Sequence, residues 1–425
     1  MVLLKKANDL PPMSSTSTDD TLATEAGIQT YLRNTPFTSH TVDQLSGGHI
    51  NFTYRIHLHV PVDGMSTFIL KYTPPYVASS ADVDPMPFPP GPSGIHPHTQ
   101  ICVKYGVHTG TVQRFEAEAL RLANTIPKPG DDNTVTAPTL RFLDQESHVM
   151  IIDDAGSATR TLREVLIDEI LPRHLLEEIG TKLGRFLAHI HEWNERPDVD
   201  LHLFANNEAG KMFLTGLIYS PIISTLTGED KLPHLLNPAL EIPEEKLATV
   251  SKLVEARTNE IHSSTVSGVM THGDYWPGNI LVSLRRGADG AIEALDRLYV
   301  LDWEMAMTGL PGSDLGQYCA ELCVVAKLFP HREESAKTII RSFLSAYGES
   351  RTIDPAMARV ALGHIGGYMV SCVPRDAGDR ERRRELVVEG VEFLDLSWTG
   401  PESSLVNSII GPLLSANSGH NLAVN

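Results

Sequence analysis

The stretch Thr271-His272-Gly273-Asp274-Tyr275-Trp276-Pro277-Gly278-Asn279 places a carboxylate and a carboxamide five residues apart, directly before the apolar run Ile280-Leu281-Val282. A second carboxylate, Asp302, follows another apolar run, Leu298-Tyr299-Val300-Leu301. Magnesium takes oxygen ligands, and phosphoryl transfer uses a carboxylate to orient the attacking hydroxyl. The His-x-Asp-x-x-x-x-Asn pattern and the strand-end Asp supply both, so together they predict a small-molecule kinase.

The two apolar runs indicate a hairpin whose turn lies between Arg285 and Asp296. Such a hairpin brings Asn279 and Asp302 close together, where both are expected to touch a magnesium ion held by a triphosphate. Asp274 is expected to accept a hydrogen bond from the acceptor hydroxyl and to take its proton. On its own the loop pattern is of moderate specificity, because an Asp near a Pro-Gly turn commonly caps that turn. The hairpin and Asp302 strengthen the prediction.

Four neighbouring residues have predicted supporting roles. His272 is expected to orient the loop through hydrogen bonds rather than to perform chemistry. Asp314 lies at the start of a predicted helix and is expected to brace the loop. Tyr275 and Trp276 are candidates for facing the acceptor, although Trp276 is equally suited to covering core.

Upstream, β-rich runs at residues 41–45 and 52–58 flank a loop that contains Gly47 and Gly48 and ends at Asn51. Adjacent glycines allow positive φ and a close approach of the backbone, which suits a loop lying over phosphates. An ordinary hairpin turn explains the same pair. We expect Gly47, Gly48 and Asn51 to contact the nucleotide.

Lys71 lies near the end of a third β-rich run, residues 67–72. It is either a solvated strand end or a cation that contacts the α- and β-phosphates, as on the third strand of protein kinases. A helix predicted over residues 112–122 carries Glu116, the expected partner of Lys71, with Glu118 as the alternative.

Two more predicted strands, residues 139–143 and 148–154, complete the β-rich part, and the second ends in Asp153 and Asp154. A kinase places its hinge at this point, with backbone groups against the adenine edge, so both residues are predicted nucleotide contacts. Beyond residue 155 helical periodicity replaces strands. The predicted fold class is therefore α+β, with an N-terminal antiparallel sheet lobe and a larger, mainly helical C-terminal lobe.

Composition divides the chain into an arm at residues 1–22, a nucleotide-binding lobe at 23–154, a catalytic and substrate lobe at 155–400, and a tail at 401–425. The arm and the tail are rich in small polar residues and are expected to be flexible. Residues 74–110 are rich in Pro, which predicts a surface insertion in the first lobe rather than a core element.

The formal net charge of −18 argues against nonspecific binding to nucleic acid. Four cysteines do not make a disulfide framework, and Cys319 and Cys323 are expected to be buried thiols on one face of a helix. The first residues lack an apolar run of signal-peptide length, and no stretch approaches membrane-spanning length. We therefore expect a cytoplasmic protein, with neither a membrane nor nucleic acid among its partners.

The chain resembles the aminoglycoside phosphotransferase/choline kinase superfamily, and within it the methylthioribose-kinase-like branch. The motifs that carry the resemblance are Gly47-Gly48, Lys71, Glu116, His272-Gly273-Asp274 with Asn279, and Asp302-Trp303-Glu304. The resemblance covers roughly residues 25–400. It implies a bilobal protein-kinase-like fold, ATP and Mg²⁺ as cofactors, and transfer to a hydroxyl of a small molecule. The Pro-rich insertion after Lys71 is longer than expected for such proteins, and acceptor-binding residues in this superfamily vary with the substrate.

A hydroxylated amine, a sugar-like alcohol or an antibiotic therefore all remain candidate acceptors. A protein kinase is disfavoured, because the sequence lacks Asp-Phe-Gly and Ala-Pro-Glu signatures. A catalytically silent nucleotide-binding scaffold is the other alternative. It has no chemical need to retain Lys71, Asp274, Asn279 and Asp302 together.

Overall fold

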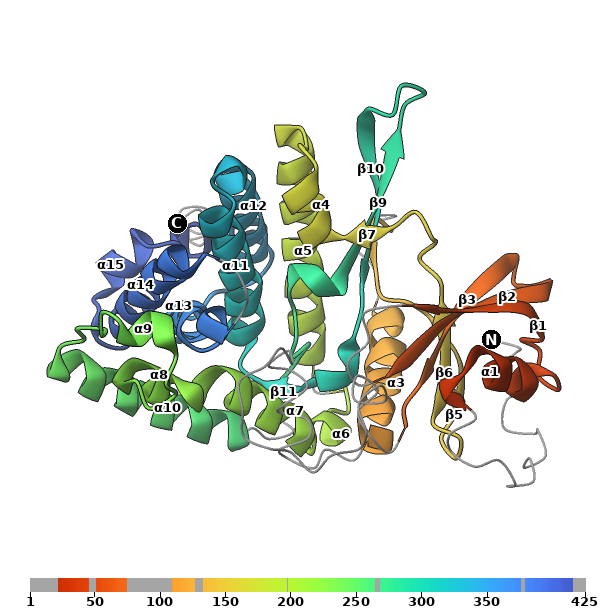
Figure 1. The fold of residues 1–425 in the computed structure, drawn as a ribbon, viewed down its shortest axis with the longest axis horizontal. Helices are drawn as coiled ribbons and strands as arrows, with labels where there is room; N and C mark the ends of the chain where they lie inside the picture. Colours follow the sequence, from red (N-terminus) through yellow and green to blue (C-terminus); the bar gives the residue numbers. More distant parts are fainter. Residues whose placement is uncertain are drawn as a thin grey trace.

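The computed structural model describes residues 22–45, 51–74, 109–126, 133–196, 198–263, 268–375 and 379–415. The predicted phosphate-loop glycines Gly47 and Gly48, the arm before residue 22 and residues 75–108 of the insertion lie outside these ranges. In the described part, a sheet-rich portion stands at one end of the molecule and helices fill the other end (Figure 1).

The sheet-rich portion is built on a five-stranded antiparallel sheet in the order β1-β2-β3-β6-β5. Its strands are β1 (Ser39–Leu45), β2 (Phe52–Val62), β3 (Met65–Tyr72), β5 (Leu140–Asp144) and β6 (Val149–Asp153). Alternate residues in the first half of β2 are buried, as expected for a strand with one face on a core. Together with helix α1 (Glu25–Leu32), this face encloses a small core of its own.

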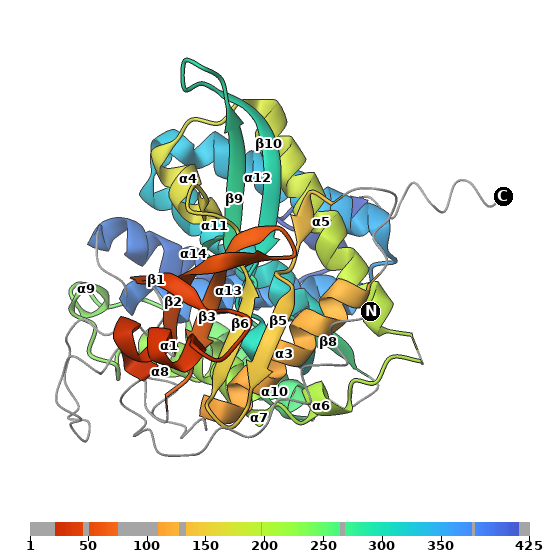
Figure 2. The ribbon, with the colours of Figure 1, turned by 90° about the vertical axis from the view of Figure 1, so that its right-hand side faces the viewer.

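Helix α3 (Thr109–Thr125) lies beside β5 and packs against η6 (Trp303–Met305), the short turn that follows Asp302 (Figure 2). The structure therefore contains the helix that was predicted over residues 112–122. Its inner face buries Ala117 and Leu120 together with Glu116. A carboxylate on this face is brought next to β3, which carries Lys71.

Strands β9 (Ile280–Arg286) and β10 (Ile292–Val300) form a long hairpin that projects from the molecule (Figures 1 and 2). Val300 pairs with Ile280 at its root, and Ile292 pairs with Arg286 near its tip. The predicted turn from Arg285 to Asp296 is wrong in extent, because strand pairing continues well past the apolar runs. Short strands β4 (Val135–Thr136) and β7 (Arg160–Thr161) flank the hairpin.

Helices form most of the remaining chain and bury the large apolar core. Before the hairpin they are α4 (Leu162–Asp168), α5 (Arg173–Asn194), α6 (His202–Ala205), α7 (Glu208–Leu214), α8 (Pro221–Thr227), α9 (Pro233–Leu236) and α10 (Glu244–His262). After it come α11 (Pro311–Leu328), α12 (Glu333–Ser350), α13 (Pro355–Ser371), α14 (Arg380–Thr399), α15 (Glu402–Val406) and α16 (Gly411–Ser415). The predicted fold class, an antiparallel sheet followed by a mainly helical part, is confirmed.

The segment Pro355–Arg375, which contains α13, has the length and apolar composition of a membrane span, contrary to the expectation that no stretch approaches that length. In the structure, 83% of the most apolar 18-residue stretch of this segment is buried inside the protein. Neighbouring α14 approaches so closely that a Cβ on Gly366 would lie 2.5 Å from the carbonyl oxygen of Gly390. The apolar composition of α13 is therefore that of a central core helix.

The expectation of a flexible tail after residue 400 is wrong for residues 402–415. This segment forms α15 and α16, and Leu405, Ile410 and Leu413 are completely buried. Helix α16 packs against α12. The segment carries apolar pairs at four-residue intervals, Leu405-Val406, Ile409-Ile410 and Leu413-Leu414, which the polar composition of the whole tail obscured.

Candidate active site

A cleft of about 510 Å³ opens where β3, α3, α4 and the root of the β9–β10 hairpin meet. Its lining includes the predicted site residues Asn51, Lys71, Glu116, Asp153, Asp154, Asp274, Asn279 and Asp302. Every described residue that was predicted to act in catalysis or to bind nucleotide or metal therefore lies at one cleft, although these residues come from segments far apart in the chain.

Lys71 is held between two carboxylates in this cleft. Its Nζ lies 2.7 Å from Oε1 of Glu116 and also contacts Oδ1 of Asp302. Burial alone would lower the pKa of Lys71, but the charges of Asp302 and Glu116 raise it, so the ammonium group stays protonated. Glu116 is thus the partner of Lys71, whereas Glu118 pairs with Arg121 at the surface.

Asp274 lies in a loop whose backbone requires glycine at the preceding position. Gly273 has a φ of +81°, and a Cβ there would lie 2.3 Å from the carbonyl oxygen of Met305. The Asp274 carboxylate accepts hydrogen bonds from Nε2 of Gln317 at 2.6 Å and from Nδ2 of Asn279 at 2.9 Å. Burial raises the pKa of Asp274 to about 7, even though these two hydrogen bonds lower it. A carboxyl group with this pKa is suited to proton transfer near neutral pH.

Asp314, in the first turn of α11, braces the same loop. Its two carboxylate oxygens accept hydrogen bonds from the backbone N–H groups of His272 at 2.7 Å and Gly273 at 3.0 Å. Burial would raise the pKa of Asp314, but hydrogen bonds from buried His191 and from the loop hold it below its usual value. His272 Nε2 donates to the carbonyl oxygen of Leu301 at 2.9 Å. The structure therefore shows the predicted bracing by Asp314 and the predicted orienting contact of His272.

Asn279 and Asp302 meet at the root of the hairpin, where the backbone N–H of Leu301 donates to the carbonyl oxygen of Asn279 at 2.8 Å. Asp302 has a φ of +56°, a left-handed conformation that is uncommon for residues with a Cβ and that often marks functional sites. Nδ2 of Asn279 donates to Asp274. The amide oxygen is therefore the atom of Asn279 that suits a cation.

Glu304 adds a further carboxylate beside those of Glu116, Asp274 and Asp302. Its Oε2 accepts a hydrogen bond from Nδ2 of Asn51 at 3.1 Å. Burial and the neighbouring carboxylates raise the pKa of Glu304 to about 8. This concentration of negative charge is of the kind that a bound divalent cation offsets.

The oxygen donors of the cleft suit magnesium, which takes carboxylate and amide oxygens. Asn279 and Asp302 supply one donor of each kind at the hairpin root. Across the described residues, however, no three His, Cys, Asp or Glu side chains form a group able to hold a metal ion. Magnesium would therefore share its coordination between these side chains and nucleotide phosphates, the usual arrangement at such sites.

The carboxylates of Asp153 and Asp154 are engaged by arginines rather than left for a ligand. Nε of Arg141 lies 2.5 Å from Asp153, and Nε of Arg55 lies 2.7 Å from Asp154. The two side chains therefore stabilise the end of the sheet. The predicted contact with an adenine edge would fall to the backbone of this segment.

Tyr275 does not face the cleft, contrary to the expectation for this residue. It is 1% exposed and packs in the core against Tyr318. Trp276 does line the cleft and covers Gly278, where a Cβ would lie 2.2 Å from the indole ring. Its indole group also lowers the pKa of Asp274. Of the two aromatic candidates, only Trp276 is placed to meet an acceptor.

Two residues of the site were missed as contributors from the sequence. Gln317 lies three residues after Asp314, which places both on one face of a helix, and that spacing was the available signal. Glu304 stands two residues after Asp302 but had no role assigned to it. Its contact with Asn51 joins positions 253 apart in the sequence, and no local pattern reveals such a contact.

The buried Lys71–Glu116 pair, Asp302 beside it and the Asp274–Asn279 loop in the same cleft together define a phosphoryl-transfer site of the kinase class. Residues 162–360 match the model of the phosphotransferase enzyme family, APH. This part of the chain is therefore similar to that family. The predicted superfamily and the predicted class of enzyme, a phosphotransferase, are confirmed.

Two relatives align with most of the chain. The 4-hydroxytryptamine kinase of Psilocybe cubensis is 26% identical over 397 residues, which are 92% of this chain and 97% of that kinase. The 4-hydroxytryptamine kinase of Psilocybe cyanescens is 26% identical over 380 residues, which are 87% of this chain and 92% of that kinase. The ADP-bound crystal structure of aminoglycoside phosphotransferase APH(2'')-Ib covers 87% of this chain and 98% of its own, with 14% identity and a TM-score of 0.42. That TM-score is too low to add to the fold described above.

Proposed function

We propose that the protein transfers the γ-phosphoryl group of ATP to a hydroxyl group of a small molecule, with Mg²⁺ as a cofactor. The observation that carries this proposal is the presence of Asp274 and the Lys71–Glu116–Asp302 cluster at one cleft. An ammonium group held by two carboxylates suits phosphate oxygens, and a carboxyl group with a pKa of about 7 suits proton transfer.

In this proposal, residues 23–154 hold the nucleotide and residues 155–400 hold the acceptor. Lys71 contacts the α- and β-phosphates, and Glu116 keeps it in position. Asp274 accepts a hydrogen bond from the acceptor hydroxyl, directs it in line with the γ-phosphorus and takes its proton. Its carboxylate is fixed for this task by the hydrogen bonds from Gln317 and Asn279. When bound, Mg²⁺ held by Asn279 and Asp302 would offset charge on the phosphate oxygens.

A hydroxylated amine is the first acceptor class to test. Both relatives that align over most of the chain are 4-hydroxytryptamine kinases. The cleft also has more acidic than basic side chains, which favours a cationic ligand. The acids are Glu116, Asp153, Asp154, Glu164, Asp274, Asp302 and Glu304, and the bases are Arg55, Lys71 and Arg163.

The proposal is tested by incubating the purified protein with Mg²⁺-ATP and a panel of acceptors that contains 4-hydroxytryptamine, other hydroxylated amines, sugars and aminoglycosides. ADP release and the mass of the acceptor are measured together. The expected result is an acceptor that gains one phosphoryl group for each ADP released. Nucleotide binding without turnover on any panel member would instead indicate a silent scaffold.

The first prediction concerns pH. The base form of Asp274 is the active one, and burial raises the pKa of Asp274 to about 7. We therefore expect kcat/KM to rise with pH, to reach half of its plateau near pH 7, and to stay level above it. Initial rates measured at subsaturating acceptor from about pH 5.5 to 8.5 check this. A rate that is flat across this range, or that falls with rising pH, would contradict the assignment.

The second prediction concerns Asp302→Asn. This change removes the negative charge from a proposed magnesium ligand while keeping the shape of the side chain. We expect the affinity for Mg²⁺-ATP to fall about tenfold or more, which is about 1.4 kcal/mol or more. Titration calorimetry with Mg²⁺-ATP, and with ATP in EDTA, measures the effect. Wild-type affinity for Mg²⁺-ATP in the variant would exclude Asp302 as a ligand.

A further inference from the structure

Helix α4 forms one wall of the cleft. Thr161, Arg163 and Glu164, which begin the helix, are all lining residues. Nε of Arg163 lies 3.4 Å from Glu321 of α11. Glu321 follows Gln317 by one helical turn, and Gln317 donates to Asp274. The start of α4 therefore lies on the Asp274 side of the cleft, where α4 also packs against η5 (Pro277–Asn279).

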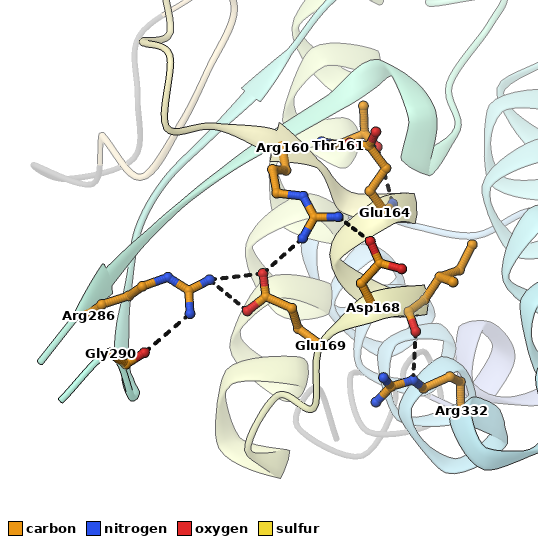
Figure 3. Close-up of polar contacts among 9 residues, drawn as sticks. Arg160, Thr161, Glu164, Asp168, Glu169, Arg286, Gly290 and Arg332 are labelled. Atoms are coloured by element: carbon orange, nitrogen blue, oxygen red, sulfur yellow. Dashed lines mark hydrogen bonds and ion pairs between the residues drawn. The ribbon is translucent and has the colours of Figure 1, made fainter.

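The other end of α4 is held by three arginines from three separate segments (Figure 3). Arg286 of β9 makes two contacts with Glu169, at 2.6 and 2.9 Å. Arg160 of β7 contacts Asp168 and lies 3.2 Å from Glu169. Arg332, in η7 (Pro330–Arg332), donates to the carbonyl oxygen of Ile167 at 3.1 Å. We call Arg160, Arg286 and Arg332 the arginine clamp.

The clamp places three positively charged side chains at the C-terminal end of α4. Cations at the C-terminal end of a helix interact favourably with its dipole. Glu169 is 18% exposed and joins Arg160 to Arg286, so the clamp is a network of charges and not an isolated surface ion pair. Through Arg286, the projecting hairpin is tied directly to the wall of the cleft.

Contacts other than the clamp also hold α4. Thr161 and Glu164 make a capping box at its start, and Leu162, Val165 and Leu166 are buried in the core. These contacts fix the start of α4 and its inner face. The contacts at the far end therefore bear on the position of α4 along and about its axis, and so on where Arg163 lies in the cleft.

We propose that Glu169, through Arg160 and Arg286, is a positioning residue that sets α4 at the acceptor end of the cleft and thereby controls acceptor binding. This inference rests on the proposed kinase function, because it assigns the Asp274 side of the cleft to the acceptor. Glu169 itself touches no reacting group. Its loss should therefore change the affinity for the acceptor without changing the affinity for the nucleotide.

The test is Glu169→Gln, which keeps the shape of the side chain and removes its charge. With 4-hydroxytryptamine and Mg²⁺-ATP as probes, we expect KM for the acceptor to rise about fivefold and KM for ATP to change by less than about twofold. The acceptor KM of the wild type should also rise more steeply with added salt than that of the variant, because the variant lacks the charge of Glu169. The control is Glu177→Gln, which removes an exposed ion pair with Arg173 on α5 and should change neither KM.

The outcomes are distinct. Equal changes in both KM values, or no change in either, would overturn the positioning role. Absence of turnover by the wild type on the whole acceptor panel would overturn the proposed function, and this inference with it. If Glu169→Gln folds poorly, Arg286→Met on the hairpin tests the same contact, and hydrogen exchange in the peptide that contains α4 should accelerate in that variant. Unchanged exchange and an unchanged acceptor KM in Arg286→Met would refute the proposal.

Discussion

Asp274→Asn is expected to lower kcat by about 10²–10⁴-fold, the usual contribution of a general base. Asparagine keeps the shape of the side chain, but it offers one acceptor oxygen to the two donors Gln317 and Asn279, and it cannot take a proton from the acceptor. Because Lys71, Asp302 and the sheet are untouched, the affinity for Mg²⁺-ATP should stay close to that of the wild type. Rates at saturating acceptor and calorimetric titration with Mg²⁺-ATP measure the two quantities separately.

Asp296→Asn is the matched control for this experiment. Asp296 lies on the exposed hairpin, where it accepts a hydrogen bond from Ser283 at 2.8 Å. That variant should turn over at the wild-type rate. If Asp274→Asn also ran at the wild-type rate, the central assignment would be wrong. If it lost nucleotide binding instead of turnover, Asp274 would have a structural role.

Much of this site could be predicted because its chemistry is local in sequence. Asp274 and Asn279 share one loop, and Asn279 and Asp302 stand at the two ends of one hairpin. A hairpin brings its two ends together by construction, so strand patterns were enough to predict that contact. Lys71 and Glu116 were predictable for a different reason. Protein kinases also carry a Lys on the third strand of the sheet and pair it with a Glu on the helix that follows.

Other contacts join segments without any local pattern. Glu304 meets Asn51, and Gln317 reaches Asp274, only because separate elements pack against each other. Tyr275 illustrates the same difficulty in the other direction. Its neighbour Trp276 lines the cleft, but the backbone turn between them directs Tyr275 into the core. Adjacency in a loop says little about which side chain faces a ligand.

The arginine clamp could not be predicted from the sequence either, because three of the protein's many arginines converge on α4 only after folding.

The prediction of a flexible tail was wrong for a different reason. Apolar pairs recur every four residues at Leu405-Val406, Ile409-Ile410 and Leu413-Leu414, but the Ser-, Gly- and Asn-rich composition of the whole tail outweighed this helical spacing. Composition averaged over a whole tail hides a short run that has helical spacing.

Lys71→Met is the second change with a large expected effect. Lys71 is 9% exposed and Glu116 is 2% exposed, so methionine would leave a buried carboxylate without its cation. Breaking a buried pair from one side typically costs about 3–5 kcal/mol of unfolding free energy. The affinity for Mg²⁺-ATP should fall at least about tenfold as well, because the phosphates lose a charge-assisted donor. Urea unfolding and nucleotide titration measure the two effects.

The double variant Lys71→Met/Glu116→Gln separates stability from nucleotide binding. The double variant has no buried carboxylate at position 116 that lacks a cation. It should therefore be more stable than Lys71→Met alone. Its nucleotide affinity should nevertheless stay low, since the cation that contacts the phosphates is still missing. Lys337→Met, at an exposed pair with Glu333, is the matched control and should change stability by less than about 1 kcal/mol. Wild-type nucleotide affinity in the double variant would show that the buried pair serves the fold alone.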